Sequence, residues 1–175
     1  MKKLIACMML VMTISACQQK EEPGSHDHDH LPLAPLQAQD DLKVIREVTK
    51  NDPGNVNAWI KLGNTLMDAA RFSEAIDAYQ KALEIDPKNV DVRVDMGTCY
   101  RNSGKPDIAI KEFKKALEIN PNHVNGHKNL AVVLSYDFRD KAQAIKEFEK
   151  TLQLAPNDPD AEQLKQEIQR LKSAK

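Results

Sequence analysis

A pattern that recurs every thirty-four residues constrains the fold of this chain more than any other feature of its sequence. The stretch from Val56 to Pro87 returns as the stretch from Val90 to Pro121, and it returns a third time in a looser form that ends at Pro156. A repeat of this length corresponds to a pair of helices, and stacked pairs form a solenoid with one continuous core. The period therefore predicts an all-α solenoid.

The composition agrees with a helical protein and argues against a nucleic-acid partner. Of the 175 residues, 29% are charged and only 5% are aromatic, which is typical of a helical chain with a core of small and aliphatic side chains. The formal net charge is −1, and no basic stripe with interleaved aromatic residues is present. No set of residues arranged for catalysis stands out either, so we expect neither an enzyme nor a cofactor.

The residues that recur in phase resemble the tetratricopeptide repeat family. The family pattern has a large residue, a Leu-Gly step and an aromatic or aliphatic residue in the first helix of each repeat. Ala, an aromatic residue, Ala and a terminal Pro follow in the second helix. The matching residues are, repeat by repeat, Trp59, Leu62, Gly63, Leu66, Ala75, Tyr79, Ala82 and Pro87; Met96, Gly97, Tyr100, Ala109, Phe113, Ala116 and Pro121; and Leu130, Ala131, Leu134, Ala144, Phe148 and Pro156.

This resemblance implies a right-handed α-solenoid made of three repeats, at about 56–89, 90–123 and 124–158. Gly63 and Gly97 would let the two helices of a pair approach closely. Pro106 is suited to the first turn of a second helix, and Ser73 to an N-cap. Upstream, Leu42, Ile45 and Val48 indicate an orphan helix. Downstream, a capping helix is expected at about 159–172, with Leu164, Ile168 and Leu171 on its apolar face.

Several positions depart from the family pattern. Arg93 and His127 take the place of the large residue, and Thr151 replaces the last Ala. The third repeat is one residue longer than the second, and the extra residue is expected in the turn at 136–140. Either this insertion is neutral, or its aromatic residues form a contact site.

The first sixteen residues have the proportions of a secretory signal peptide, with a basic start and an apolar run from Leu4 to Ile14. The residues Ile14-Ser15-Ala16-Cys17 resemble the lipobox of bacterial lipoproteins. This resemblance implies that residues 1–16 are removed and that Cys17 carries the lipid, palmitate included. The protein would then be anchored in the bacterial cell envelope, with the periplasmic face of the outer membrane favoured. The alternative is an ordinary signal peptide followed by an unrelated Cys.

Residues 17–39 are expected to form a flexible tether, and residues 40–175 the repeat domain. The tether contains His26, His28 and His30, which alternate with Asp residues. Imidazole binds Zn, Ni and Cu ions, but the spacing matches no structural metal site. Specific metal binding and plain solvation therefore both stay open, and no resident metal is predicted.

In the family, the first helix of each repeat lines a concave groove that binds a partner. Asn recurs at the corresponding positions of this chain, and its amide can donate to and accept from a peptide backbone. Solvation of a concave face is the alternative explanation for these Asn residues. The predicted groove residues are Asn57, Ile60, Asn64, Met67, Asp68, Asp91, Val94, Asp95, Thr98, Arg101, Asn102, Asn125, Lys128, Asn129 and Val132, with Ser135 and Tyr136 at the end.

The resemblance also argues against one ligand. Family members that clamp the C-terminal carboxylate of a chaperone use two Lys, one Arg and two Asn. The corresponding positions here are Ile60, Asn64, Asp95, Asn125 and Asn129, so all three cations are missing. We expect a neutral or basic peptide instead.

Three other residues have a structural and a functional interpretation. Cys99 is expected to be a small buried residue rather than a reactive thiol. His123 and His127 are one helical turn apart, a spacing that can hold a metal, yet no third ligand is near in the sequence. We therefore expect turn and surface histidines.

The predicted function is a membrane-tethered module for protein–protein interaction, acting as a scaffold or assembly factor. Two alternatives are an accessory protein of cytochrome c maturation and a metal-handling lipoprotein that uses the His26–His30 tether.

Overall fold

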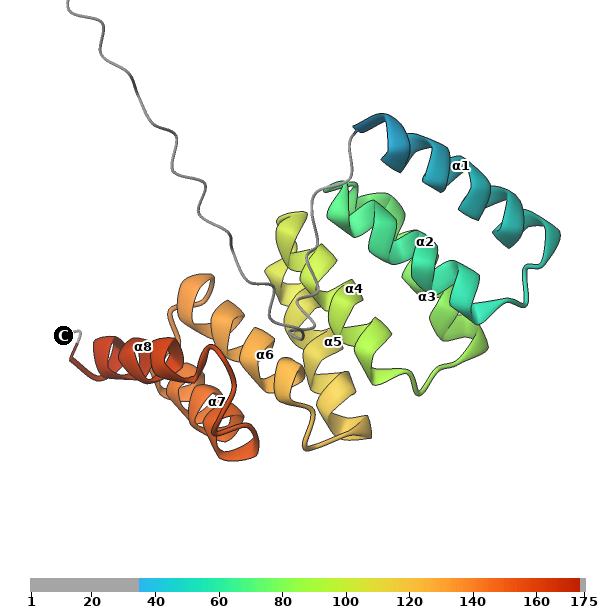
Figure 1. Ribbon diagram of the computed structural model, residues 1–175. Coiled ribbons are helices and arrows are strands. Elements are labelled where there is room, and N and C mark those ends of the chain that lie inside the picture. The colour runs from blue at the N-terminus through green and yellow to red at the C-terminus, as the bar shows by residue number, and fades with distance from the viewer. Residues whose placement is uncertain (1–34, 174–175) are drawn as a thin grey trace, which may run out of the picture. The chain divides into compact units, whose positions relative to one another are not determined.

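The computed structural model describes residues 35–173, which form eight helices and contain no strand. Their bounds are α1 Pro35–Asn51, α2 Val56–Asp68, α3 Phe72–Ile85, α4 Val90–Asn102, α5 Pro106–Ile119, α6 Val124–Tyr136, α7 Lys141–Leu154 and α8 Ala161–Ser173. The predicted solenoid of an orphan helix, three pairs and a capping helix is thereby confirmed (Figure 1). Helix α1 already begins at Pro35, inside the predicted tether at 17–39, because Pro fits the first turn of a helix.

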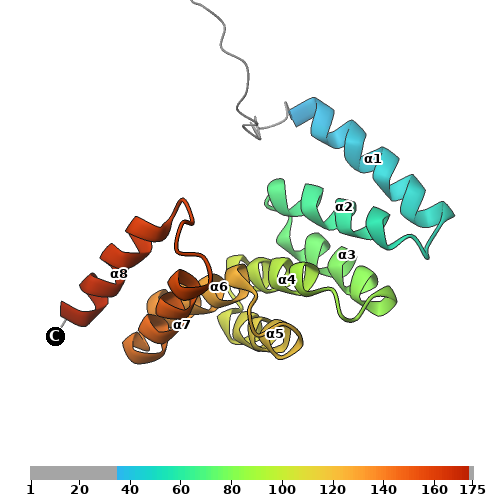
Figure 2. The same cartoon turned by 60° about the horizontal axis from the view of Figure 1, so that its bottom comes forward.

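The helices pack in the order in which they follow one another along the chain. Each pair packs internally, as α2 with α3, α4 with α5 and α6 with α7, and each second helix packs on the first helix of the next pair. Successive first helices also touch, α2 with α4 and α4 with α6, whereas no two second helices of residues 35–173 do. The first helices therefore lie on the inside of the curve, as the succession of α2, α4 and α6 in Figure 2 illustrates. We call the side of α2, α4 and α6 that faces away from the second helices the inner face.

Small residues and rings hold each pair together, as the repeat pattern predicts. Tyr79, Phe113 and Phe148 are buried completely or almost completely. A Cβ atom on Gly63 would lie 2.5 Å from Cε1 of Tyr79, and one on Gly97 would lie 2.5 Å from Cε1 of Phe113. The two glycines thus allow a ring to lie directly on the first helix.

The helix starts repeat with the period as well. Asn55 and Asn89 cap α2 and α4, since the side chain of each accepts a hydrogen bond from the backbone N–H three residues on. The predicted N-cap at Ser73 is wrong. Helix α3 begins at Phe72, so its N-cap position is Arg71, two residues before Ser73, and the Arg71 guanidinium binds Glu74 in the first turn.

Both ends of the solenoid are finished by an amphipathic helix. On α1, Leu42 and Ile45 are buried against α2, but Val48 is 42% exposed, because α1 has no helix on its other side. Thr49 takes the buried position that the sequence assigned to Val48. On α8, the predicted apolar face is confirmed, because Leu164, Ile168 and Leu171 are buried. Ala161 is buried as well.

Candidate functional site

The inner face carries the residues that the sequence predicts for a partner. Helices α2, α4 and α6 contribute them at equivalent positions, because the period of the repeat places equivalent residues side by side. The polar side chains that are well exposed on this face are Asn57, Asn64, Asp68, Asp91, Asn102 and Asn125. The half-buried residues of this face, polar and apolar, are Ile60, Met67, Asp95, Thr98, Arg101, Lys128, Asn129 and Val132.

Two of the predicted asparagines already bind other residues of the protein. The Tyr79 hydroxyl donates to Oδ1 of Asn64 at 2.8 Å, which satisfies the one polar atom of this buried ring. The Asn129 amide donates to Oγ1 of Thr98 at 3.2 Å and so joins α6 to α4. Asn57 and Asn125 are exposed, and neither side chain makes a hydrogen bond to another residue whose side chain the structure describes.

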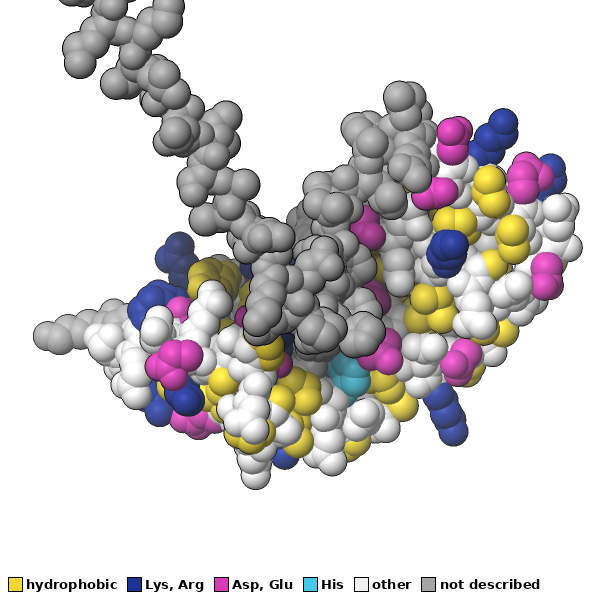
Figure 3. All heavy atoms as spheres, in the orientation of Figure 1, with side chains coloured by type: hydrophobic (Ala, Val, Ile, Leu, Met, Phe, Trp, Pro, Cys, Tyr) yellow, Lys and Arg dark blue, Asp and Glu magenta, His cyan; other side chains and the backbone are white. Residues whose placement is uncertain are grey.

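The cations of the inner face are paired within the protein. Arg101 Nε binds Oδ2 of Asp137 at 2.7 Å, and Lys128 Nζ binds Oδ2 of Asp160 at 2.9 Å. Over the face drawn in Figure 3, acidic and basic side chains of the described residues are interspersed. Arg101 and Lys128, the two basic residues predicted for the inner face, therefore offer a partner no unpaired positive charge.

Asp95 is the carboxyl group of this face with the least favourable surroundings. Burial raises its pKa to about 6, and the nearby carboxylates of Asp91 and Asp68 add to the rise, while His123 opposes it. Asp91 is bound by Nε2 of His123 at 2.8 Å, whereas Asp95 has no hydrogen bond or ion pair within residues 35–173. A half-buried acid that has no partner among the described residues favours a cationic ligand.

Val94 does not belong to the accessible part of the groove. It is only 2% exposed and packs in the core cluster that α4 shares with α5, α6 and α7. The sequence predicted it as a groove residue from its repeat position, but its side chain fills the junction between neighbouring repeats. It offers almost no surface to a partner.

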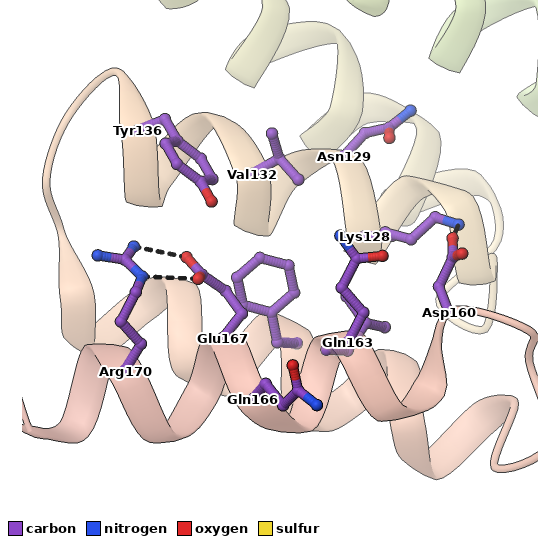
Figure 4. Close-up of a pocket in the computed structure, with 11 residues that line it drawn as sticks. Lys128, Asn129, Val132, Tyr136, Asp160, Gln163, Gln166, Glu167 and Arg170 are labelled. Carbon is purple, nitrogen blue, oxygen red and sulfur yellow. Dashed lines mark hydrogen bonds and ion pairs between the residues drawn. The ribbon is translucent and has the colours of Figure 1, made fainter.

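A cleft of about 580 Å³ lies between α6 and α8, at the C-terminal end of the inner face. Lys128, Asn129, Val132 and Tyr136 line it from α6, and side chains of α8 face them (Figure 4). Its other lining residues are Phe148, Asp160, Gln163, Leu164, Gln166, Glu167 and Arg170. None of these belonged to the predicted groove, because the sequence assigned α8 only to capping.

Charged and aromatic side chains interact at the end of the cleft that is lined by Tyr136. Arg170 binds both carboxylate oxygens of Glu167 at 2.6 and 2.7 Å, and its guanidinium lies 5.8 Å from the ring centre of Tyr136. The hydrogen bond from Arg170 lowers the pKa of Glu167, and further bonds from Tyr136 and Ser135 contribute. The four-residue turn after Tyr136 contains the predicted extra residue, and it leaves Tyr136 58% and Phe138 42% exposed.

Arg93 and His127 form hydrogen-bonded pairs inside their repeats. Arg93 binds Glu112 at 2.9 Å, and Nδ1 of His127 lies 2.6 Å from Oε2 of Glu147. The prediction that His127 is a surface residue is therefore wrong, since it is 9% exposed. A sequence signal was present: the repeat that has a large apolar residue at this position has Ala78 where the other two have Glu.

His123 and Cys99 have structural roles. His123 caps α6, because its Nδ1 accepts the Gly126 N–H at 3.0 Å. Cys99 is fully buried, and burial raises the pKa of its thiol to about 12, which agrees with a structural residue. No group of three or more metal-ligating side chains occurs within residues 35–173.

Several predictions concern residues outside the described range. They are the signal peptide, the lipidation of Cys17, and the candidate metal ligands His26, His28 and His30. Within the described part of the chain, no helix has the length and apolar character needed to cross a membrane.

Comparison with known proteins agrees with the repeat architecture. Residues 66–131 match the family described as tetratricopeptide repeat. A crystal structure of MamA protein superposes with a TM-score of 0.68 at 24% identity and covers 77% of this chain and 73% of that chain. A second crystal structure of MamA has the same TM-score at 22% identity and covers 77% of this chain and 82% of that one. No curated protein matches the sequence significantly.

One further similar structure contains a ligand. It is the first TPR of Spaghetti (RPAP3) bound to the HSP90 peptide SRMEEVD, with a TM-score of 0.61 at 21% identity, and it covers 67% of this chain and 90% of that chain. The fold supports a module for protein–protein interaction. Residues 66–131 are thus similar to the tetratricopeptide repeat family, and the described helices form a solenoid of the same architecture.

Proposed function

We propose that this protein binds an extended segment of a partner protein on the inner face of its solenoid, and that a lipid on Cys17 tethers it to the cell envelope as a scaffold or assembly factor. The observation that carries the binding proposal is the exposed row of amide and carboxylate side chains on three helices that touch one another. Side-chain amides such as Asn57 and Asn125 suit a peptide backbone, because each offers both a donor and an acceptor.

The charges of the inner face favour a neutral or basic segment. Asp68 and Asp95 have no ion pair among the described residues, while Arg101 and Lys128 are neutralised by acids of the same chain. An acidic peptide such as the one bound by RPAP3 would place carboxylates beside Asp95. That residue already has a raised pKa, so a second negative charge there is unfavourable.

The tether is supported by sequence only. The apolar run and the residues Ile14 to Cys17 resemble a lipoprotein signal, and several acyl chains on one Cys give stable anchoring where a single chain would be marginal. Mass spectrometry of the mature N-terminus tests this directly. A chain that begins at Cys17 with acyl groups supports the anchor, and one that begins elsewhere without lipid contradicts it.

The binding proposal is tested by crosslinking in the native envelope, followed by capture of the full chain and identification of the attached proteins. Asn64 and Asn129 are poor choices for substitution, because they bind Tyr79 and Thr98 and their loss would disturb packing. The test variant is therefore Asn57→Ala with Asp68→Ala and Asn125→Ala.

A matched control changes three exposed residues on a second helix, outside the inner face. Lys111→Ala with Lys114→Ala and Glu118→Ala on α5 serves this purpose. We expect the inner-face variant to lose at least one partner that the control retains. If both variants retain every partner, the inner face is not the binding site.

A further inference from the structure

We propose that the cleft between α6 and α8, together with Asp95, binds an extended peptide segment that carries one apolar side chain and, about three residues away, one Lys or Arg side chain. This inference rests on the proposed function. It adds the chemical class of the ligand, and it assigns α8 a binding role beside its capping role.

The cleft exists because α8 does not continue the packing of the first helices. Helix α2 packs on α4 and α4 packs on α6, but α8 packs on α7 alone among the described helices. Side chains bridge the gap at both ends, through Lys128 with Asp160 and through Ser135 with Glu167 at 3.4 Å. Between these bridges the α6 and α8 side chains face each other across an open space (Figure 4).

The surfaces inside the cleft suit one apolar side chain of a peptide. Val132, Phe148 and Leu164 supply apolar lining, and about 580 Å³ is within the range of known ligand pockets. The charged side chains at its rim already form ion pairs, Lys128 with Asp160 and Glu167 with Arg170. A charged ligand group would have to compete with these pairs, so a neutral side chain is favoured.

The rim of the cleft suits a peptide backbone. Gln163 and Gln166 are exposed on α8, and neither makes a side-chain hydrogen bond within residues 35–173. Asn129 lies opposite on α6 and uses one amide hydrogen for Thr98. These amides can bind the C=O and N–H groups of an extended chain that crosses the cleft.

Asp95 supplies the second element of recognition. It precedes Thr98 by three residues on α4, so the two side chains lie on the same side of that helix. Thr98 binds Asn129, which lines the cleft. Neighbouring helices are about 8–10 Å apart, and an extended chain advances about 3.3 Å per residue. A peptide with its apolar residue in the cleft would therefore bring a residue about three positions away to Asp95.

The charge at Asp95 decides the kind of residue. This carboxyl group is half-buried, it has no ion pair among the described residues, and its neighbours Asp68 and Asp91 are acids. A Lys or Arg side chain would satisfy the carboxylate. A second carboxylate would be repelled.

The test uses phage-displayed random twelve-residue peptides, selected on the immobilised full chain. We expect selected peptides to share an apolar residue with a Lys or Arg two to four positions away. Binding of synthetic copies is then measured by fluorescence polarisation. If no peptide is enriched, both this inference and the proposed function are contradicted.

Matched variants separate the two proposals. Gln163→Trp fills the cleft from its rim, and Gln169→Trp places the same side chain on α8 away from the cleft. Asp95→Asn removes the recognition charge, and Asp77→Asn removes an exposed charge on α3. We expect Gln163→Trp to weaken binding about tenfold and Asp95→Asn about fivefold, with the controls unchanged. Peptides that bind all four variants equally contradict the cleft but leave the inner face as a binding surface.

Two other occupants are distinguished in the same assay. A synthetic peptide of residues 17–36 is added as competitor, and the mass of the full chain in solution is measured by sedimentation. Displacement of the selected peptides by residues 17–36 would assign the cleft to the chain's own tether and overturn the proposal. A dimer that Gln163→Trp converts to a monomer would assign it to a second copy and overturn it too.

Discussion

His127 and Glu147 form a buried pair between the two helices of the third repeat, with Nδ1 of the imidazole 2.6 Å from Oε2 of the carboxylate. The other ring nitrogen, Nε2, lies 2.9 Å from the carbonyl oxygen of Pro121. Because a carbonyl oxygen only accepts, Nε2 must carry a hydrogen. The imidazole thus joins the start of its own repeat to α7.

The same position makes the same backbone contact in every repeat. Trp59 donates to the carbonyl oxygen of Pro53, and Arg93 donates to that of Pro87, each at 2.9 Å. A partner on the second helix is present only where the residue is polar: Arg93 has Glu112, whereas the position facing Trp59 is Ala78. The two positions are therefore coupled within each repeat.

This coupling predicts the behaviour of a double-mutant cycle. His127→Trp alone leaves the Glu147 carboxylate without its partner, and we expect a loss of about 1–3 kcal/mol in the free energy of unfolding. Adding Glu147→Ala recreates the Trp59 and Ala78 combination of the first repeat and should recover most of the loss. Urea denaturation measures both values. Additive effects of the two substitutions would show that the pair is not coupled.

Asp95 predicts a pH-dependent stability. Its pKa of about 6 in the folded protein lies above the ordinary Asp value, so the folded state binds the proton more tightly than the unfolded state. The free energy of unfolding therefore falls as the pH rises from about 4 through 6. At pH 8, Asp95→Asn should unfold at a higher temperature than the wild type. Its free energy of unfolding should be greater by at most about 3 kcal/mol, since one pKa unit corresponds to about 1.4 kcal/mol.

Below about pH 3, under both the folded and the unfolded pKa of this group, the wild-type carboxyl group is protonated in both states, and the two proteins should have nearly the same melting temperature. Asp77→Asn, on the exposed side of α3, is the control and should show no such pH-dependent difference. An Asp95→Asn variant that is less stable than the wild type at pH 8 would contradict the unfavourable surroundings assigned to this carboxylate.

Gly97 is predicted to tolerate no side chain. A Cβ atom would lie 2.5 Å from Cε1 of Phe113, and that ring is 1% exposed and cannot move aside freely. Gly97→Val should lower the free energy of unfolding by about 1–3 kcal/mol through overpacking. Gly54→Val is the matched control, because its Cβ would meet only Asp52 at 3.7 Å. Equal stabilities of the two variants would show that the close approach of α4 and α5 is not needed.

Cys99 should be inert in the folded protein. Its side chain is completely buried, and burial raises the pKa of its thiol to about 12. In a Cys7→Ser and Cys17→Ser background, a thiol reagent at pH 8 should modify the chain only as fast as it unfolds. The rate should therefore rise with urea concentration. Rapid modification in the absence of urea would contradict this burial.

Much of the fold follows from the sequence because its determinants are local and repeated. The thirty-four-residue period sets the helix pairs, Gly63 and Gly97 mark where a ring must lie on a helix, and Pro87 and Pro121 separate the repeats. Each of these signals acts within one repeat, and three copies reinforce one another. The expected N-cap at Ser73 is wrong because α3 already begins at Phe72, with Arg71 at the N-cap position and no side-chain capping hydrogen bond.

The tertiary structure decided which side chains of the predicted groove are free. Repeat position alone predicts Val94, Asn64 and Arg101 as groove residues. In the structure, however, Val94 is buried, Asn64 binds Tyr79 and Arg101 binds Asp137. These outcomes depend on side-chain contacts between different helices. A one-dimensional period carries no information about such contacts.

The cleft between α6 and α8 illustrates the same division. The sequence alone determined that α8 is an amphipathic helix at the end of the stack, through the spacing of Leu164, Ile168 and Leu171. Only the packing of α8 on α7, with its backbone held away from α6, decided that a cleft forms there. The reason is physical: an apolar stripe specifies that a helix must be covered, whereas the angle and distance at which it packs depend on the side chains of every neighbour.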